Sequence, residues 1–178
     1  MINSGFWRTL TGTTAIALIP SLLWSQQQPA RPCADGGVYN QFDFWVGDWD
    51  VFNPQGQQAG TNRIEKTQGG CMLLENWTSV RGGTGTSMNF YNPVTEKWIQ
   101  IWTDPQGTVI DVEGEFRDGA MSFEGTHYYP DGHTELYRMT FTPNEDGSVQ
   151  QFIQQSRDDG ESWYVWFNGR YVRQASQG

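Results

Sequence analysis

Glu75 is the residue of this chain best placed for acid–base chemistry. It lies between Leu74 and Trp77, so on a buried segment its surroundings would be apolar. Burial disfavours the charged form of a carboxyl group and raises its pKa, as a general acid or base at neutral pH requires. Arg138 also has apolar and aromatic neighbours and could bind a ligand carboxylate through two hydrogen bonds. A structural ion pair between Glu75 and Arg138 is the alternative, and for Arg138 we favour a salt bridge.

The other titratable residues do not form a recognisable catalytic or metal site. His127 and His133 have no Cys or carboxylate at the spacing of a metal site, and His133 follows a Pro-Asp-Gly turn. Asp111, Glu113 and Glu115 alternate in the sequence, which indicates a solvated outer face rather than a cation site. No nucleophile elbow, phosphate-binding loop or dinucleotide fingerprint is present. We therefore expect no metal, no cofactor and no dedicated catalytic residue set.

The N-terminus predicts export. Arg8 precedes an uncharged, mostly apolar run from Thr9 to Trp24, which is typical of a secretory signal peptide. We interpret residues 1–25 as the signal peptide and residues 26–38 as a linker. An uncleaved membrane anchor is the alternative. The expected location is therefore the periplasm or the cell exterior, with no membrane contact after cleavage.

The cysteine count agrees with export. Cys33 and Cys71 are the only two cysteines, and an even number in a secreted chain indicates a disulfide. The bridge would join the segment before the fold to the third predicted strand. Two unpaired thiols are the alternative.

Nine turn signals at nearly even intervals define the elements that must position these residues. Each signal combines residues that preset a turn dihedral or tolerate a positive φ. The segments between them are rich in aromatic and β-branched residues and too short for helices. They predict an all-β fold over residues 39–174, an antiparallel up-and-down barrel of about ten strands whose lumen could hold a ligand. After one short helical turn over 39–46, the expected strands are 47–53, 57–68, 71–80, 84–92, 97–104, 109–117, 120–129, 133–143, 148–157 and 162–173.

Two rows of side chains alternate along the central strands. The aromatic-polar row consists of Ser87, Asn89, Tyr91, Trp98, Gln100 and Trp102. The apolar row consists of Met88, Phe90, Ile99 and Ile101. Either row could face the lumen, since successive side chains of a strand point to opposite faces. The pattern alone slightly favours the apolar row inside, as an ordinary core.

Several motifs carry a resemblance to a known family. They include the opening FDFWVGDWDV from Phe42 to Val51, LENW from Leu74, GTSMNFY from Gly85, WIQIW from Trp98 and FNGRY from Phe167. Over residues 33–173 the chain resembles a widespread bacterial family of secreted domains of unknown function, recognised by F-D-F-W-x-G-x-W. It also resembles calycin-like barrels, including lipocalins and nitrobindins, and ten strands fit the nitrobindin pattern better than the eight of lipocalins.

The first strand carries a second resemblance to lipocalins. Gly47-Asp48-Trp49 is similar to the G-x-W motif that opens the first lipocalin strand. In that family a basic residue of the last strand packs over the tryptophan. Arg170 or Arg173 could serve here.

The resemblance implies that the aromatic-polar row faces the lumen, because the family's motif residues fall mainly in that row. The ligand-binding residues would be Glu75, Trp77, Ser87, Asn89, Tyr91, Trp98, Gln100 and Trp102, with Arg138 meeting any charged end. The apolar row would then form an exposed outer patch, which predicts a homodimer. For His127 the nitrobindin resemblance raises haem ligation, but we favour a hydrogen-bonded strand residue.

The net charge argues against one class of function, the binding of nucleic acids. The formal net charge is −9, with 20 acidic and 11 basic residues, and no basic run offers a surface for nucleic acid. We expect a secreted barrel that binds a small, partly apolar molecule, and we lean away from an enzyme. The alternatives are an isomerase, cyclase or hydrolase that uses Glu75 in the same lumen, and a filled barrel with a structural or interaction role.

Overall fold

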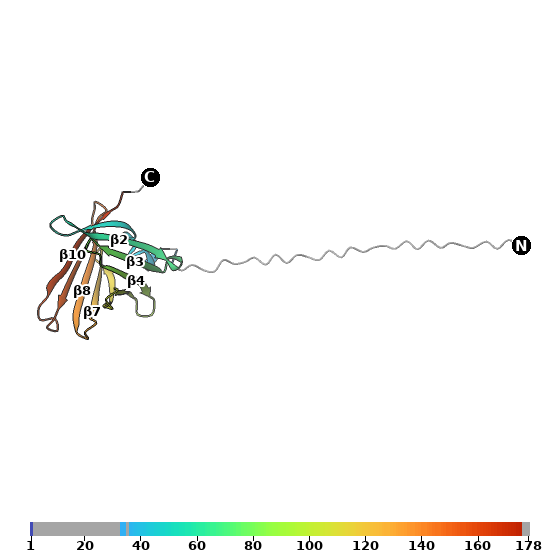
Figure 1. The fold of residues 1–178 in the computed structure, drawn as a ribbon. Helices are drawn as coiled ribbons and strands as arrows, with labels where there is room; N and C mark the ends of the chain where they lie inside the picture. Colours follow the sequence, from blue (N-terminus) through green and yellow to red (C-terminus); the bar gives the residue numbers. More distant parts are fainter. Residues whose placement is uncertain (2–32, 35, 176–178) are drawn as a thin grey trace. The chain divides into compact units, whose positions relative to one another are not determined.

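Ten antiparallel strands close into one barrel (Figure 1). The structure, a computed structural model, describes Met1, residues 33–34 and residues 36–175. The predicted signal peptide after Met1 and the linker residues 26–32 and 35 lie outside these described residues. Each strand pairs with its neighbours in sequence, and β1 pairs with β10 to close the sheet. The predicted all-β up-and-down barrel is confirmed.

The ends of the strands match the expected ones within one residue, except that β10 begins two residues late. They are β1 (Gly47–Phe52), β2 (Gln58–Thr67), β3 (Met72–Ser79), β4 (Thr84–Asn92), β5 (Lys97–Thr103), β6 (Val109–Arg117), β7 (Ala120–Tyr128), β8 (Thr134–Pro143), β9 (Val149–Ser156) and β10 (Tyr164–Arg173). Strand ends are trimmed where turn side chains bind the backbone instead. Asn53 Oδ1, for example, accepts hydrogen bonds from the backbone N–H groups of Gln55 and Gln57.

Short 3₁₀ turns close one end of the barrel. The single helical turn expected over 39–46 is two turns, η1 (Gly37–Asn40) and η2 (Asp43–Trp45), and η3 (Gln68–Gly70) joins β2 to β3. Phe42 and Trp45 are fully buried and stack with ring centroids 5.0 Å apart. Phe42 also contacts Phe141 and Trp98. The β1–β2, β3–β4, β5–β6, β7–β8 and β9–β10 turns lie at the end of the barrel opposite this aromatic plug.

The predicted disulfide joins Cys33 to Cys71, across 38 residues of sequence. It ties the segment before η1 to the residue that precedes β3. Within the part of the chain that the structure describes, no helix is long and apolar enough to cross a membrane.

The aromatic-polar row faces the lumen. Ser87, Asn89 and Gln100 are buried, whereas Met88 of the apolar row is 45% exposed. The slight preference of the alternation pattern for an apolar interior was therefore wrong. Alternation shows which residues share a face of the strand but not which face points into the barrel. Polar side chains can fill a lumen when they hydrogen-bond one another.

Candidate functional site

The lumen contains a cavity of about 810 Å³ at the barrel end away from the aromatic plug. Its walls are mainly aromatic and aliphatic side chains: Trp77, Trp102, Trp166, Phe167, Ile110 and Ile153. Its polar lining comes from Glu75, Gln100, Tyr137, Gln151 and Tyr171. Asn53, Gln57 and Arg81, which belong to turns between strands, lie at the rim. The cavity therefore has apolar walls around a small group of polar side chains.

Two glycines seat the tryptophans of one wall. A Cβ atom at Gly85 would lie 2.1 Å from the Trp102 ring, and one at Gly60 would lie 2.6 Å from the Trp77 ring. No side chain fits at such distances, so each indole packs directly against the backbone of a neighbouring strand. This close packing holds both indoles against the barrel wall, where they line the cavity.

A bulge places a third tryptophan at the mouth. The register of β10 with β9 shifts between Val165 and Phe167, so Trp166 is not paired in the sheet. Its ring lies 5.6 Å from His127 and 6.0 Å from Tyr137, centroid to centroid, and lines the cavity. Irregular strand positions of this kind commonly redirect a side chain toward a site.

A chain of hydrogen bonds leads along the strands to Glu75. Gln100 Nε2 donates to Asn89 Oδ1 at 2.5 Å, and Asn89 Nδ2 donates to Ser87 Oγ at 2.8 Å. The Ser87 hydroxyl then donates to Glu75 Oε2 at 2.5 Å. These residues occupy inward positions of β3, β4 and β5, where the register sets Glu75 opposite Ser87 and Asn89 opposite Gln100.

A second chain continues from Glu75 to the far side of the barrel. Asn62 Nδ2 donates to Glu75 Oε1 at 2.7 Å and lies 3.2 Å from the Tyr171 hydroxyl. Tyr171 donates to Gln151 Oε1 at 2.7 Å. Glu75, Gln100, Tyr171 and Gln151 of the polar lining thus belong to one connected network, which fixes the orientation of their side chains.

Glu75 is a buried acid held by neutral partners. It is 6% exposed, and burial raises its pKa above 4.5, although the hydrogen bonds from Ser87 and Asn62 act in the opposite direction. Among the described residues, no salt bridge includes Glu75. The carboxyl group can therefore hold a proton inside the lumen.

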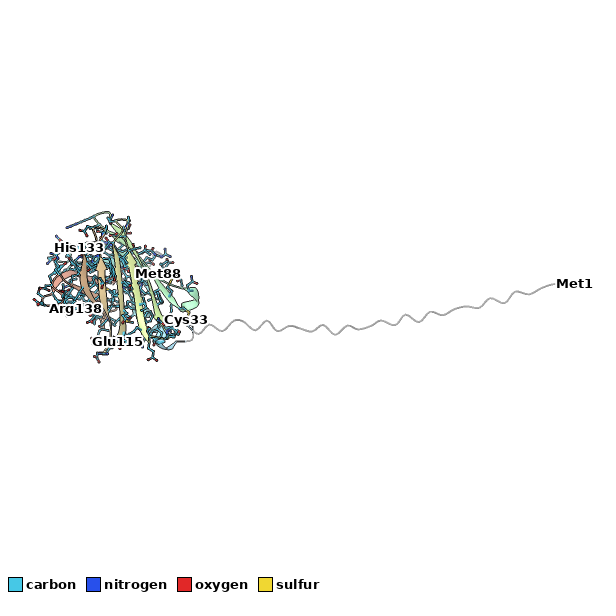
Figure 2. All side chains as sticks on the ribbon, turned by 90° about the horizontal axis from the view of Figure 1, so that it is seen from below. Met1, Cys33, Met88, Glu115, His133 and Arg138 are labelled. Atoms are coloured by element: carbon cyan, nitrogen blue, oxygen red, sulfur yellow. A yellow bond between two sulfur atoms is a disulfide. The ribbon has the colours of Figure 1, made fainter. Side chains whose placement is uncertain are left out.

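Arg138 does not reach this carboxyl group. It lies on the outer face of β8, where its Nε donates to Gln154 Oε1 at 2.9 Å and its guanidinium lies 4.0 Å from the centre of the Trp163 ring. In Figure 2 it lies with His133 on the side of the barrel away from Cys33. The alternative of an ion pair with Glu75 was wrong, as was a place for Arg138 in the lumen, because its neighbours Tyr137 and Met139 are the inward residues of this strand.

The other predicted site residues divide into two groups. Glu75, Trp77, Gln100 and Trp102 line the cavity, while Ser87 holds Glu75 and Asn89 holds Gln100 through hydrogen bonds. Tyr91 and Trp98 lie instead at the plugged end, where their rings contact each other and Trp98 Nε1 donates to Gln41 Oε1 at 3.2 Å. They belong to the closed end of the barrel rather than to the ligand cavity.

The structure adds residues that the sequence analysis missed. Asn62, Tyr137, Gln151, Tyr171, Trp166 and Phe167 all line the cavity or bind its polar groups. Alternation along β8 and β9 would have placed Tyr137 and Gln151 on the inward face, in phase with Met139 and Ile153. Trp166 could not be found this way, because the bulge breaks the alternation.

His127 is a hydrogen-bonded strand residue, as favoured. Its Nδ1 lies 2.5 Å from Gln155 Nε2, and its ring stacks on Tyr129 at 4.1 Å. Burial lowers the pKa of His127, against the opposing charges of Glu135 and Asp104. Within the described residues, no group of three or more His, Cys, Asp or Glu side chains is arranged to hold a metal ion.

Comparisons with known proteins assign no family to this chain. No family model matches it, and no curated protein is significantly similar to it. The resemblance to the bacterial secreted family therefore stays a prediction, and function is inferred here from the geometry of the lumen.

Proposed function

We propose that this protein binds a small, partly apolar molecule in the barrel lumen. The observation that carries the proposal is the cavity of about 810 Å³ beside Glu75 and Gln100. Typical ligand pockets have volumes of roughly 300–1,000 Å³, apolar walls and a few well-placed polar groups. The tryptophan walls and the connected polar network fit that description.

The cavity argues against a filled barrel with only a structural role. A barrel of about eight strands is just wide enough for side chains to fill its interior, and the diameter grows with the number of strands. Here Gly60 and Gly85 let the Trp77 and Trp102 rings pack against the wall, and a cavity of about 810 Å³ lies beside them. The plug of Phe42 and Trp45 fills one end alone, which leaves the other end for a ligand.

Glu75 supports a second candidate function. A buried carboxyl group with a raised pKa in a largely apolar lumen suits an isomerase, cyclase or hydrolase, in which it would donate or accept a proton at the ligand. The raised pKa of Glu75 and its position in the cavity lining favour this candidate. Turnover that is lost in Glu75→Gln while binding persists would distinguish the enzyme from the binding protein.

The disulfide supports a place in an oxidising compartment. Disulfides persist in the periplasm and outside the cell and are rare in reducing cytosol. With the predicted signal peptide, the Cys33–Cys71 bridge favours a periplasmic or secreted protein.

Mass spectrometry of molecules that co-purify with the native protein tests the proposal. Gln100→Leu should weaken retention by about 1–3 kcal/mol, because a ligand polar group would lose its partner. Trp102→Ala should weaken it further by removing a wall, and should also destabilise the barrel by several kcal/mol. Gln154→Leu on the outer face is the matched control and should retain the molecule. Equal retention by Gln100→Leu, Trp102→Ala and the control would place the ligand outside the lumen.

A further inference from the structure

Two hydrogen-bond donors in the lumen share one poor acceptor. The Tyr137 hydroxyl lies 4.0 Å from Met139 Sδ, and Gln151 Nε2 lies 3.1 Å from the same sulfur. A thioether is a weak acceptor, so neither donor has a good partner in this arrangement. Buried donors without good partners cost free energy, and a better acceptor would therefore be bound favourably.

The orientation of the Gln151 amide is fixed. Its Oε1 already accepts a hydrogen bond from Tyr171 at 2.7 Å. Its NH₂ group must then point the other way, toward Met139. The glutamine therefore presents a donor, and not an acceptor, beside Tyr137.

Both donors are reachable from the cavity. Tyr137 and Gln151 line it, whereas the 2% exposed Met139 is not part of the lining. A ligand atom entering the lumen thus meets the two donors in front of the sulfur. One oxygen atom with two lone pairs could accept from both.

The charge of this region excludes an anion at that position. Among the described residues that line the cavity, Arg81 is the one cation, and it lies exposed at the rim. Deeper in the lumen, a ligand carboxylate would face Glu75 with no positive partner. Burying an unpaired charge is far more costly than burying a neutral acceptor.

We propose that the inner end of the lumen recognises an uncharged carbonyl oxygen, as in a ketone, quinone, amide or lactone. The Tyr137 hydroxyl and Gln151 Nε2 donate to this oxygen and give up their contacts with Met139. The inference rests on the proposed function, since it names the chemical class of the lumen ligand.

Fluorenone and fluorene test it, because they share one aromatic frame and differ by a carbonyl in place of a methylene. Equilibrium dialysis of the native protein, freed of co-purified molecules, should show fluorenone bound about ten-fold more tightly, the effect of one or two neutral hydrogen bonds. The infrared carbonyl stretch of bound fluorenone should move to lower frequency than in a hydrocarbon solvent.

Variants assign the effect to the two donors. Tyr137→Phe and Gln151→Leu should each lower the ratio of fluorenone affinity to fluorene affinity, by about the effect of one lost neutral hydrogen bond. Met139→Leu, which conserves volume, removes the competing sulfur and should keep or increase the preference.

The outcomes separate this inference from the proposed function. Equal binding of both probes with an unshifted carbonyl stretch would overturn carbonyl recognition and leave lumen binding intact. An unchanged preference in both Tyr137→Phe and Gln151→Leu would do the same. Failure of both probes to bind would count against the lumen as a ligand site, and the carbonyl inference would fall with it.

Discussion

Ser87 donates a 2.5 Å hydrogen bond to the carboxyl group of Glu75, from the facing position on the adjacent strand. Asn62 binds the other carboxyl oxygen, so both partners are neutral. Hydrogen bonds alone do not offset the loss of water around the carboxylate, and the pKa of Glu75 stays above 4.5. Ionisation of this one group therefore acts against the fold.

The pH dependence of the free energy of unfolding should reveal the raised pKa of Glu75. Its pKa is higher in the folded than in the unfolded state, so its stabilising contribution is complete below about pH 4.5 and is lost as pH rises through the folded-state pKa. The free energy of unfolding of the wild type minus that of Glu75→Gln should fall as the pH rises above about 4.5 and through the folded-state pKa. Denaturant titrations over this range provide the measurement. Taking the difference cancels the groups common to both proteins.

Ser87→Ala is the matched variant. It removes a hydrogen bond that lowers the pKa of Glu75, so the fall in the free energy of unfolding that comes from ionisation of Glu75 should move to higher pH. If the free energy of unfolding of the wild type minus that of Glu75→Gln stays flat or rises with pH, the assignment of Glu75 as a buried acid is contradicted.

Reduction of the Cys33–Cys71 bridge should lower stability by about 3 kcal/mol, because it releases a 38-residue loop in the unfolded chain. Thermal unfolding with and without reductant measures this loss. The Cys33→Ser/Cys71→Ser double variant should match the reduced protein and should not respond to reductant. Two thiols alkylated without prior reduction, in protein from an oxidising compartment, would refute the bridge.

Arg173 should stabilise the closed end of the barrel. Its guanidinium lies 4.3 Å from the centre of the buried Trp49 ring, and its Nη1 donates to the Val46 carbonyl at 3.0 Å. This is one of the two arginines that the resemblance to lipocalins pointed to. Arg173→Met should lower the free energy of unfolding by about 1 kcal/mol.

Arg170→Met is the control on the same strand. Arg170 pairs with Asp146 where both side chains are exposed, so the loss should be smaller. Chemical denaturation of both variants makes the comparison. A larger loss for Arg170→Met would reverse the assignment.

We propose that the outer patch of Met88, Phe90, Ile99 and Ile101 mediates a homodimer. Met88 is 45% exposed, and the other three are half-buried on the outer face of β4 and β5. Light scattering should give the mass of a dimer for the wild type and of a monomer for Ile99→Asp. Val94→Asp, in the exposed turn between these strands, should remain dimeric. A monomeric wild type would disprove this use of the patch.

The fold could be predicted from the sequence because its turns are local. Asn53 and Asp104 bind the backbone N–H groups two and four residues later, so turn positions depend on neighbouring residues only. The site depends on which residues meet across the barrel, and that follows from register and phase. Alternation could not decide the phase of β4 and β5, and the resemblance was needed to place Ser87 and Gln100 inside.

Arg138 shows most clearly where prediction of the site from the sequence failed. Apolar neighbours in sequence suggested burial, but on a strand the neighbours point to the opposite face. Tyr137 and Met139 therefore mark the lumen, and Arg138 lies outside with Gln154. The contact of Tyr137 and Gln151 with one sulfur depends on β8 and β9 together, and no single segment of the sequence contains it.

A crystal structure of the protein purified from its native source would test the central claim most directly. Lumen binding predicts density for a small molecule against Trp77 and Trp102, with a polar atom within hydrogen-bond distance of Gln100. Ordered water alone in the cavity, in a preparation that mass spectrometry shows to carry a small molecule, would contradict it. So would side chains that close the space of about 810 Å³.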